Sequence, residues 1–177
     1  RDAPGQLNFA TSGPATILDL GVRQMLALAG LPLDAAQAVP FRGGGEALTA
    51  LLGGSVQFVG NNLGDMMGAL RDGSIRALVA SAPIEALPAV PGAGQAGLPG
   101  LAALAGWNAL AAPAALPEPL VAQWAAALAA LARDEAWLAA NRRLGSVPRV
   151  LGPAETKAHV VAQIALFRGL AQRLGLG

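Results

Sequence analysis

Between residues 38 and 59 the apolar positions change their spacing twice. A short apolar run ends at Phe41, three glycines follow it, and residues 46–52 then carry alanine and leucine at helical spacing. The glycines at 53–54 are placed to end that helix, and the apolar residues of 56–59 resume an extended segment. The pattern predicts one strand–helix–strand unit, which is the building block of a parallel sheet.

The same change between extended and helical spacing recurs on both sides of this unit. Residues 7–10 are predicted as a strand, and a helix follows to about residue 28, with Ser12 as its capping residue. On the other side, a helix is predicted over about 63–71 and a strand over 75–80. Four strands that alternate with three helices predict a parallel sheet with right-handed crossovers, and therefore an α/β fold.

Prolines and glycines interrupt the pattern over residues 82–106, which predicts a long connection. The composition changes near Gly106, and this is the candidate boundary between two domains, 1–106 and 107–177. Beyond it the pattern predicts, in order, a strand at 107–113, alanine-rich helices at about 117–131 and 134–143, a strand at 147–151, and a helix from 153 to about 174.

Three loops fall at the carboxyl ends of the predicted strands, at 11–16, 42–45 and 60–62. Open α/β sheets bind their ligands at this edge. The glycines at 43–45 leave backbone N–H groups uncovered at a helix N-terminus, which carries positive potential, and Arg42 adds a charge. The three loops together predict an anion site, although ordinary turn chemistry also explains each loop taken alone.

Composition excludes several classes of protein. Hydrophobic residues make up 54% of the 177 positions and charged residues 13%, with a net charge of +1, so the chain is neither a disordered protein nor a basic nucleic-acid-binding one. No stretch of about 18 apolar residues continues without proline, glycine or charge, so no membrane span is predicted. The sequence has no cysteine, which excludes disulfides and thiolate chemistry.

No set of residues in the sequence indicates catalysis. The single histidine, His159, lies opposite the apolar row of its predicted helix and is interpreted as a solvated side chain. The single lysine, Lys157, follows no glycine-rich loop, which excludes a phosphate-binding loop of the P-loop type. Asp19 and Asp65 each stand one turn into a helix, where carboxylates complement the helix dipole. The sequence predicts no enzyme, no metal site and no cofactor.

These motifs, taken in order, resemble those of one family. The chain resembles the Bug-type periplasmic receptors, which are the solute-binding components of tripartite tricarboxylate transporters. The order of the motifs is more specific than any one of them, and together they cover nearly the whole chain. The segments that carry the resemblance are LNFATSG at 7–13, VPFRGG at 39–44, ALTALLGGSV at 47–56, NNL at 61–63, GSIRAL at 73–78, LPAVP at 87–91, AGLPG at 96–100, WNAL at 107–110 and AP at 112–113.

This resemblance implies a type II periplasmic-binding-protein-like α/β fold, in which two lobes close on a small carboxylate. Residues 1–106 would form a complete second lobe with a parallel-rich sheet, which binds the ligand. Residues 107–177 would form the mainly helical C-terminal part of the first lobe. The resemblance further implies a periplasmic, non-enzymatic receptor that delivers its ligand to the membrane subunits of the transporter and needs no cofactor.

The resemblance also implies a set of ligand-binding residues on the three loops. Arg42 stands where the family usually has lysine, Phe41 where it has tyrosine, and Asn61 where it has aspartate. A hydroxyl and a negative charge are thereby absent, which leaves the identity of the carboxylate open. The implied set is Ser12, Gly13, Ala15, Thr16, Phe41, Arg42, Gly43 and Asn61.

Members of the resembled family have a first-lobe segment before the equivalent of Leu7, a residue that lies close to the start of this sequence. We therefore expect a receptor fragment whose helices beyond residue 107 expose apolar faces and favour a homodimer. The alternative, from a different class, is an interaction or regulatory module that kept the fold and lost transport. Neighbouring genes for transporter membrane subunits would favour the first function, and a neighbouring sensor kinase the second.

Overall fold

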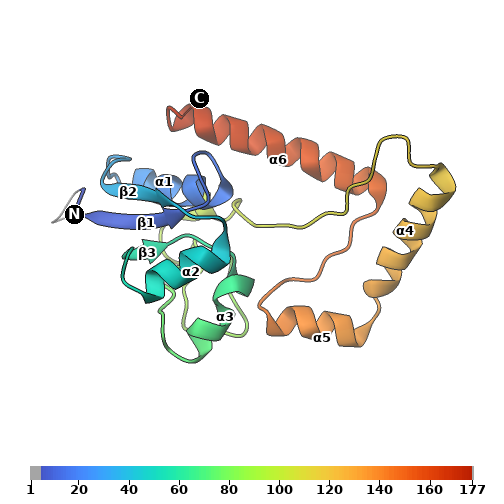
Figure 1. Cartoon of the computed structure of the whole chain (residues 1–177), viewed down its shortest axis with the longest axis horizontal. Helices are drawn as coiled ribbons and strands as arrows, with labels where there is room; N and C mark the ends of the chain where they lie inside the picture. Colours follow the sequence, from blue (N-terminus) through green and yellow to red (C-terminus); the bar gives the residue numbers. More distant parts are fainter. Residues whose placement is uncertain (1–4, 177) are drawn as a thin grey trace. The chain divides into compact units, whose positions relative to one another are not determined.

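The computed structural model describes residues 5–176, and Figure 1 shows the order of its elements. Contacts divide the chain into two compact units. The first holds the chain up to Gly106 together with the segment from Arg168 onward, and the second holds Trp107–Phe167. The elements are β1 (Leu7–Thr11), α1 (Ile17–Leu28), β2 (Ala36–Pro40), α2 (Gly44–Leu52), β3 (Phe58–Val59), α3 (Leu63–Arg71), the 3-10 helix η1 (Pro99–Leu101), α4 (Glu118–Leu131), α5 (Glu135–Arg143) and α6 (Pro153–Arg173).

The first unit is built on a three-stranded parallel sheet with the order β2-β1-β3. Leu7 lies opposite Ala36 and Thr11 opposite Pro40 along one side of β1. On the other side, Phe9 lies opposite Phe58. The predicted α/β architecture with parallel pairing is therefore confirmed, and the carboxyl ends of all three strands lie at one edge.

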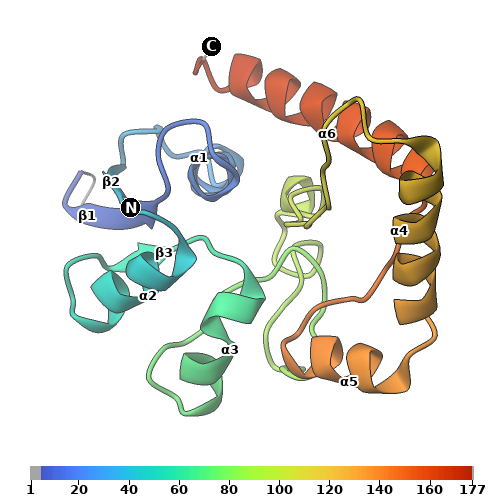
Figure 2. The same ribbon diagram turned by 45° about the vertical axis from the view of Figure 1, so that its right-hand side comes forward.

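Side chains alternate between the two faces of this sheet, as the two-residue period of a strand requires. Phe9 is fully buried in a cluster with Val22 and Leu26 of α1, and its ring stacks on Phe58 with centroids 5.7 Å apart. Its neighbour Ala10 is buried in a second cluster, with residues of α2. Figure 2 shows both helices beside the sheet. Burial of an aromatic side chain such as Phe9 contributes about 1.5–3 kcal/mol, so the centre of β1 anchors both layers.

The helices of the first unit agree with the sequence pattern except at one start. Helix α2 ends at Leu52 and is followed by Gly54 with a φ of +74°, a conformation that glycine adopts without strain. Helix α3 ends where the Asp72 carboxylate accepts the Ser74 N–H and hydroxyl, and these hydrogen bonds lower the pKa of Asp72. The prediction that Ser12 caps the first helix is wrong, because the N-cap of α1 is Thr16.

Three predicted strands do not form. Over 75–80 burial alternates as in a strand, but the Ile75 N–H donates to Ala69 and the Ala80 N–H to Pro91, so no ladder joins this segment to β3. The strand predicted at 107–113 is an exposed, irregular segment. Val147, in the strand predicted at 147–151, is 89% exposed. None of these three segments joins a ladder among the described residues. Ala80 makes only an isolated parallel bridge with Gly92, and unpaired strands do not persist.

The second unit contains α4, α5 and most of α6, and these three helices agree with the sequence pattern. Neither α4 nor α5 has a fully buried residue, and Leu120 and Trp124 of α4 are exposed. The prediction that His159 is solvated is wrong, since this side chain is half-buried and its ring meets Trp107 edge-on at a centroid distance of 5.3 Å. None of the helices described is long and apolar enough to cross a bilayer.

Candidate functional site

Two hydrogen bonds bring the three predicted loops together at the carboxyl edge of the sheet. The Phe41 N–H donates to the Thr11 carbonyl at 2.7 Å, which joins the loop after β2 to the loop after β1. The Asn61 side-chain amide donates to the Gly44 carbonyl at 3.0 Å, which joins the loop after β3 to the start of α2. The N-termini of α1, α2 and α3 therefore begin from one connected set of loops.

Side-chain hydroxyls fix the loop after β1. The Thr11 hydroxyl donates to the Gly13 carbonyl at 3.0 Å and accepts the Gly13 N–H at 3.3 Å. The Thr16 hydroxyl donates to the same carbonyl at 2.8 Å. Thr11 is buried, so these bonds are shielded from water and hold the loop in one conformation.

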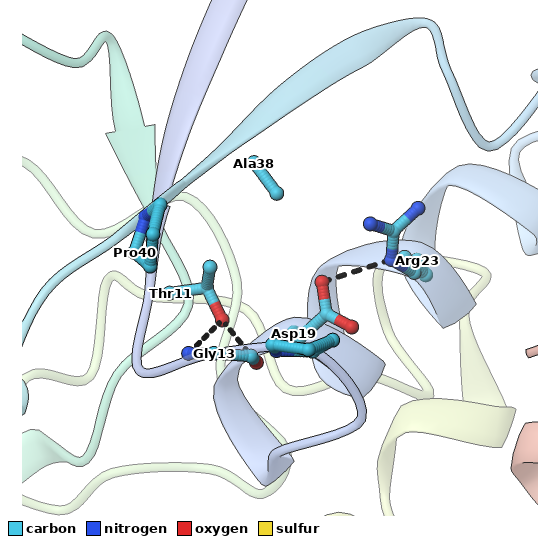
Figure 3. Close-up of a pocket in the computed structure, with 7 residues that line it drawn as sticks. Thr11, Gly13, Asp19, Arg23, Ala38 and Pro40 are labelled. Carbon is cyan, nitrogen blue, oxygen red and sulfur yellow. Dashed lines mark hydrogen bonds and ion pairs between the residues drawn. The ribbon is translucent and has the colours of Figure 1, made fainter.

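An ion pair with a buried carboxylate, Asp19 with Arg23, supports this loop. Asp19 is 1% exposed, and its carboxylate accepts the Ala15 N–H at 2.9 Å. It also accepts the Arg23 Nε–H at 2.8 Å, and Figure 3 shows this ion pair. Ala15 has a φ of +57°, which strains a residue other than glycine. The Asp19 carboxylate thus holds the turn before α1 in a conformation that its sequence does not favour.

The loop after β2 is shaped by glycine. Gly43, the N-cap of α2, has a φ of +140°, a region that side-chain-bearing residues rarely adopt. The Arg42 N–H donates to the Glu46 carboxylate at 3.0 Å, so this loop repeats the bond between Ala15 and Asp19.

Two side-chain ends lie against Gly44 and would have to move to admit a Cβ at this position. A Cβ at this position would meet the Asp65 carboxylate and would lie 2.7 Å from the Asn61 Oδ1 atom. A third carboxylate, from α3, therefore lies against the start of α2.

The first-turn N–H groups of these helices are the donors that this edge offers. The first intrahelical bond of α1 starts at Leu20 and that of α2 at Ala47, so earlier N–H groups such as those of Gly44 and Gly45 have no intrahelical acceptor. None of α1, α2 and α3 has a side-chain cap, whereas the N-cap Asp134 of α5 accepts the Trp137 N–H at 2.7 Å. Uncapped N-termini in one place can hydrogen-bond an anion.

The structure changes which atoms of the predicted residues can contact a ligand. The N–H groups of Gly13, Ala15 and Arg42 do not face a ligand freely, because each already has an internal acceptor. The Phe41 side chain packs with the apolar cluster on the α2 side of the sheet. Ser12 is exposed and makes no cap.

Gly43, Thr16 and Asn61, also predicted, do lie on the connected loops, and the Arg42 side chain is exposed beside them. Sequence reasoning treated Asp19 and Asp65 as ordinary helix-start charges and gave Glu46 and Arg23 no role. One sequence pattern could have pointed to these carboxylates: α1, α2 and α3 each have an acidic residue at their third position, namely Asp19, Glu46 and Asp65. Among residues 5–176 no group of His, Cys, Asp and Glu side chains could hold a metal ion.

Hollows in the described part of the first unit include two that involve residues of these loops. One, of about 260 Å³, lies between α1 and β2 and is lined by Thr11, Gly13, Pro14, Asp19, Arg23, Ala38 and Pro40. The other, of about 470 Å³, is an open depression on α2 lined by Phe41, Glu46, Thr49, Ala50, Gly53 and Ser55.

The loops of this parallel sheet gather three helix N-termini at one edge, and comparisons with known proteins identify the family. Residues 1–145 match the family model of the tripartite tricarboxylate transporter family receptor, and the chain belongs to this family. A UPF0065 protein of Agrobacterium vitis, from the TAR-I ttuE-ttuC' intergenic region, is 28% identical over 144 residues, which are 80% of this chain and 40% of that protein. This chain therefore spans less than half of the curated relative.

Solved structures agree on the fold. A structure described as a periplasmic transporter aligns with a TM-score of 0.88 at 26% identity, over 99% of this chain and 58% of that one. An R. palustris protein solved with adipate gives 0.86 at 24% identity, with the same coverage of both chains. A solute-binding protein of the same receptor family from Polaromonas, solved with no ligand, gives 0.65 at 18% identity, over 97% of this chain and 59% of that one. The fold is that of periplasmic-binding-protein-like receptors.

Proposed function

We propose that this chain is the ligand-binding part of an extracytoplasmic receptor that binds a small carboxylate for a tripartite tricarboxylate transporter. The observation that carries the proposal is the pair of hydrogen bonds that joins the starts of three uncapped helices, from Phe41 to Thr11 and from Asn61 to Gly44. Membership of the receptor family supports the same role. In this role the protein binds and releases its ligand without chemical change.

The chemistry of this edge favours a carboxylate over a neutral solute. Backbone N–H groups of Gly44 and Gly45 at the start of α2, and those of the first turn of α1, would donate to the carboxylate oxygens. Hydrogen bonds to a charged acceptor are about twice as strong as neutral ones. The exposed guanidinium of Arg42 would add a bidentate partner, and Thr16 and Asn61 would complete the polar lining.

The acidic residues limit how much negative charge this edge accepts. Glu46 and Asp65 carry carboxylates at the starts of α2 and α3, and Asp65 lies against Gly44. A ligand that presents one carboxylate at a time meets less repulsion than one with several clustered charges. A linear dicarboxylate of the adipate type, found in a structure of the same fold, is therefore a suitable probe.

In the proposed receptor, the first unit is the ligand-binding lobe and residues 107–167 belong to the other lobe. The receptor acts in the periplasm and hands its ligand to membrane subunits after the lobes close on it. The homodimer expected from exposed apolar helices stays a prediction.

Calorimetric titration of the chain with adipate, and with adipamide as its neutral analogue, tests the proposal. We expect saturable binding of adipate, none of adipamide, and a loss of at least about tenfold in affinity for Arg42→Ala, since a hydrogen bond to a charged group is worth about 1.5–3 kcal/mol. Gly43→Val should weaken binding as well, because valine does not adopt the φ of the N-cap.

Arg76→Ala is the matched control, because Arg76 is also exposed in the first unit but belongs to none of the three loops. Its affinity for adipate should equal that of the unaltered chain. Equal affinity in Arg42→Ala and Gly43→Val, with both variants folded, would remove the loops from the site. That result would favour the alternative function, an interaction or regulatory module that kept the fold and lost transport.

A further inference from the structure

We propose a second binding site in the groove between α1 and β2, where Arg23 binds the carboxylate of a short aliphatic acid. The groove borders the loop after β1, which lines it through Gly13 and Pro14, but its binding group is the Arg23 side chain rather than the N–H groups of the helix N-termini. Its features are a half-buried guanidinium with an unused end, a groove of small volume and an apolar opposite wall (Figure 3).

Asp19 binds only one side of the Arg23 guanidinium. The Asp19 carboxylate accepts the Nε–H of Arg23, from the side of the guanidinium, at 2.8 Å. The end of the guanidinium, with its two terminal nitrogens, hydrogen-bonds no other residue in the described part of the chain. That end has the geometry that binds a carboxylate through two parallel hydrogen bonds.

The Arg23 guanidinium is held in place before any ligand binds. Asp19 is 1% exposed and is itself fixed by the Ala15 N–H, while the Arg23 side chain is 20% exposed. The pair is also spaced four residues apart on α1, in the favourable order with the acid first. Because the arginine is already ordered, a ligand does not have to offset the entropy of ordering a long side chain.

The walls and the volume of the groove restrict what can bind beside Arg23. Ala38 and Pro40 point to the same face of β2 and form the wall opposite α1, and Pro14 lies at the loop end. Figure 3 shows the terminal nitrogens of Arg23 directed away from Asp19, on the side where Ala38 lies. A volume of about 260 Å³ is below the range of about 300–1,000 Å³ that holds drug-sized ligands, so the occupant is small.

These features together define the ligand class. The charged end of the groove selects an anion whose two oxygens match the guanidinium fork, and the apolar wall selects a short hydrocarbon body. Asp19 already balances the charge of Arg23, so a ligand with one carboxylate fits better than one with two. Butyrate is the probe that meets all three conditions.

Nuclear magnetic resonance of the Arg23 side chain tests the site during a titration with butyrate. We expect the Arg23 Nε–H signal to shift saturably with butyrate and not with butyramide. The same shift should persist in Gly43→Val, because that variant alters the N-cap of α2 and Gly43 does not line the groove. The second site would be overturned if the Arg23 signal does not shift with butyrate. It would also be overturned if the signal shifts in the unaltered chain but not in Gly43→Val.

Two variants separate binding from folding. Arg23→Lys keeps the positive charge beside Asp19 but removes the guanidinium fork, so the affinity for butyrate should fall by about tenfold. Arg76→Lys makes the same exchange at an exposed position and should leave this affinity unchanged. Ala38→Leu narrows the groove without touching the ion pair and should also reduce binding. Undiminished affinity in folded Arg23→Lys and Ala38→Leu would show that Arg23 serves the internal ion pair alone.

Discussion

The carboxylate of Asp19 accepts the backbone N–H of Ala15 at 2.9 Å and thereby holds that alanine at a φ of +57°. The residue that holds the turn is 1% exposed, while the strained residue is exposed. The strain lies in the loop that precedes α1, at the proposed carboxylate site. A loop that is held in an unfavourable conformation is ready for its ligand before the ligand binds.

Ala15→Gly should stabilise the protein. Alanine at positive φ costs about 1–2 kcal/mol, which exceeds the backbone entropy that glycine adds to the unfolded chain, about 0.5–1 kcal/mol. We expect the free energy of unfolding in urea to rise by up to about 1 kcal/mol. Ala102→Gly, at an exposed alanine with a φ of −61°, should lower it instead. A loss of stability in Ala15→Gly would show that the turn is not strained.

The neighbouring glycines of α2 should respond oppositely to alanine. A Cβ at Gly44 meets Asp65 and Asn61, whereas one at Gly45 meets nothing within 4 Å. Gly44→Ala should lower the free energy of unfolding by about 1–3 kcal/mol, because the neighbouring polar groups must move. Gly45→Ala should raise it by up to about 1 kcal/mol, because alanine is the better helix former.

The same pair also tests the site, since both changes leave the charges unaltered. Adipate binding should fall in Gly44→Ala, where the hydrogen bond from Asn61 to the Gly44 carbonyl is displaced. Gly45→Ala should bind adipate as the unaltered chain does. Identical stabilities and affinities for the two variants would contradict the close approach of α3 to the start of α2.

Removal of the Glu46 charge should tighten carboxylate binding. Glu46→Gln keeps an oxygen that can accept the Arg42 N–H but removes a negative charge from the first turn of α2. We expect adipate affinity to rise a few-fold at low salt, and the gain to shrink as salt screens it. Stability should fall by about 0.3–1 kcal/mol, because the charge complements the helix dipole. Calorimetry at two salt concentrations checks the first effect, and weaker binding would refute it.

The exposed apolar residues of α4 should govern self-association. Leu120 and Trp124 are 42% and 59% exposed, and aromatic residues are enriched in protein interfaces. If the chain forms the predicted homodimer through α4, light scattering after size exclusion should give twice the chain mass. Trp124→Ser should then reduce it to a monomer, and a dimer unaffected by Trp124→Ser would place the contact elsewhere.

Helices and most of their ends, the start of α1 excepted, were predictable from the sequence because their signals are local. The glycines after α2 and the apolar spacing of 63–71 act within a single turn of chain, and both elements form as expected. Strands depend on a partner that the local sequence does not reveal. Residues 75–80 and 147–151 have strand composition but pair with no strand among the residues described, and both predictions were wrong.

The candidate site was predictable as a place but not as a set of atoms. The carboxyl edge of the sheet follows from the alternation of strands and helices, so the three loops could be expected to meet. Which N–H groups remain available depends on side chains such as Asp19 and Glu46, which take the donors of Ala15 and Arg42. No local pattern specifies that competition, because the acceptor and donor meet only after the loop has folded.

The most direct test of the proposed site is a titration of the 15N-labelled chain with adipate, followed through its backbone amide signals. We predict saturable shifts for Gly44, Gly45 and Ile17, whose N–H groups lie in the first turns of α2 and α1. The amides of Ala15 and Arg42, which already donate to carboxylates, should respond less. Shifts that do not saturate, or that cluster away from these helix starts, would contradict a carboxylate site at the edge of the sheet.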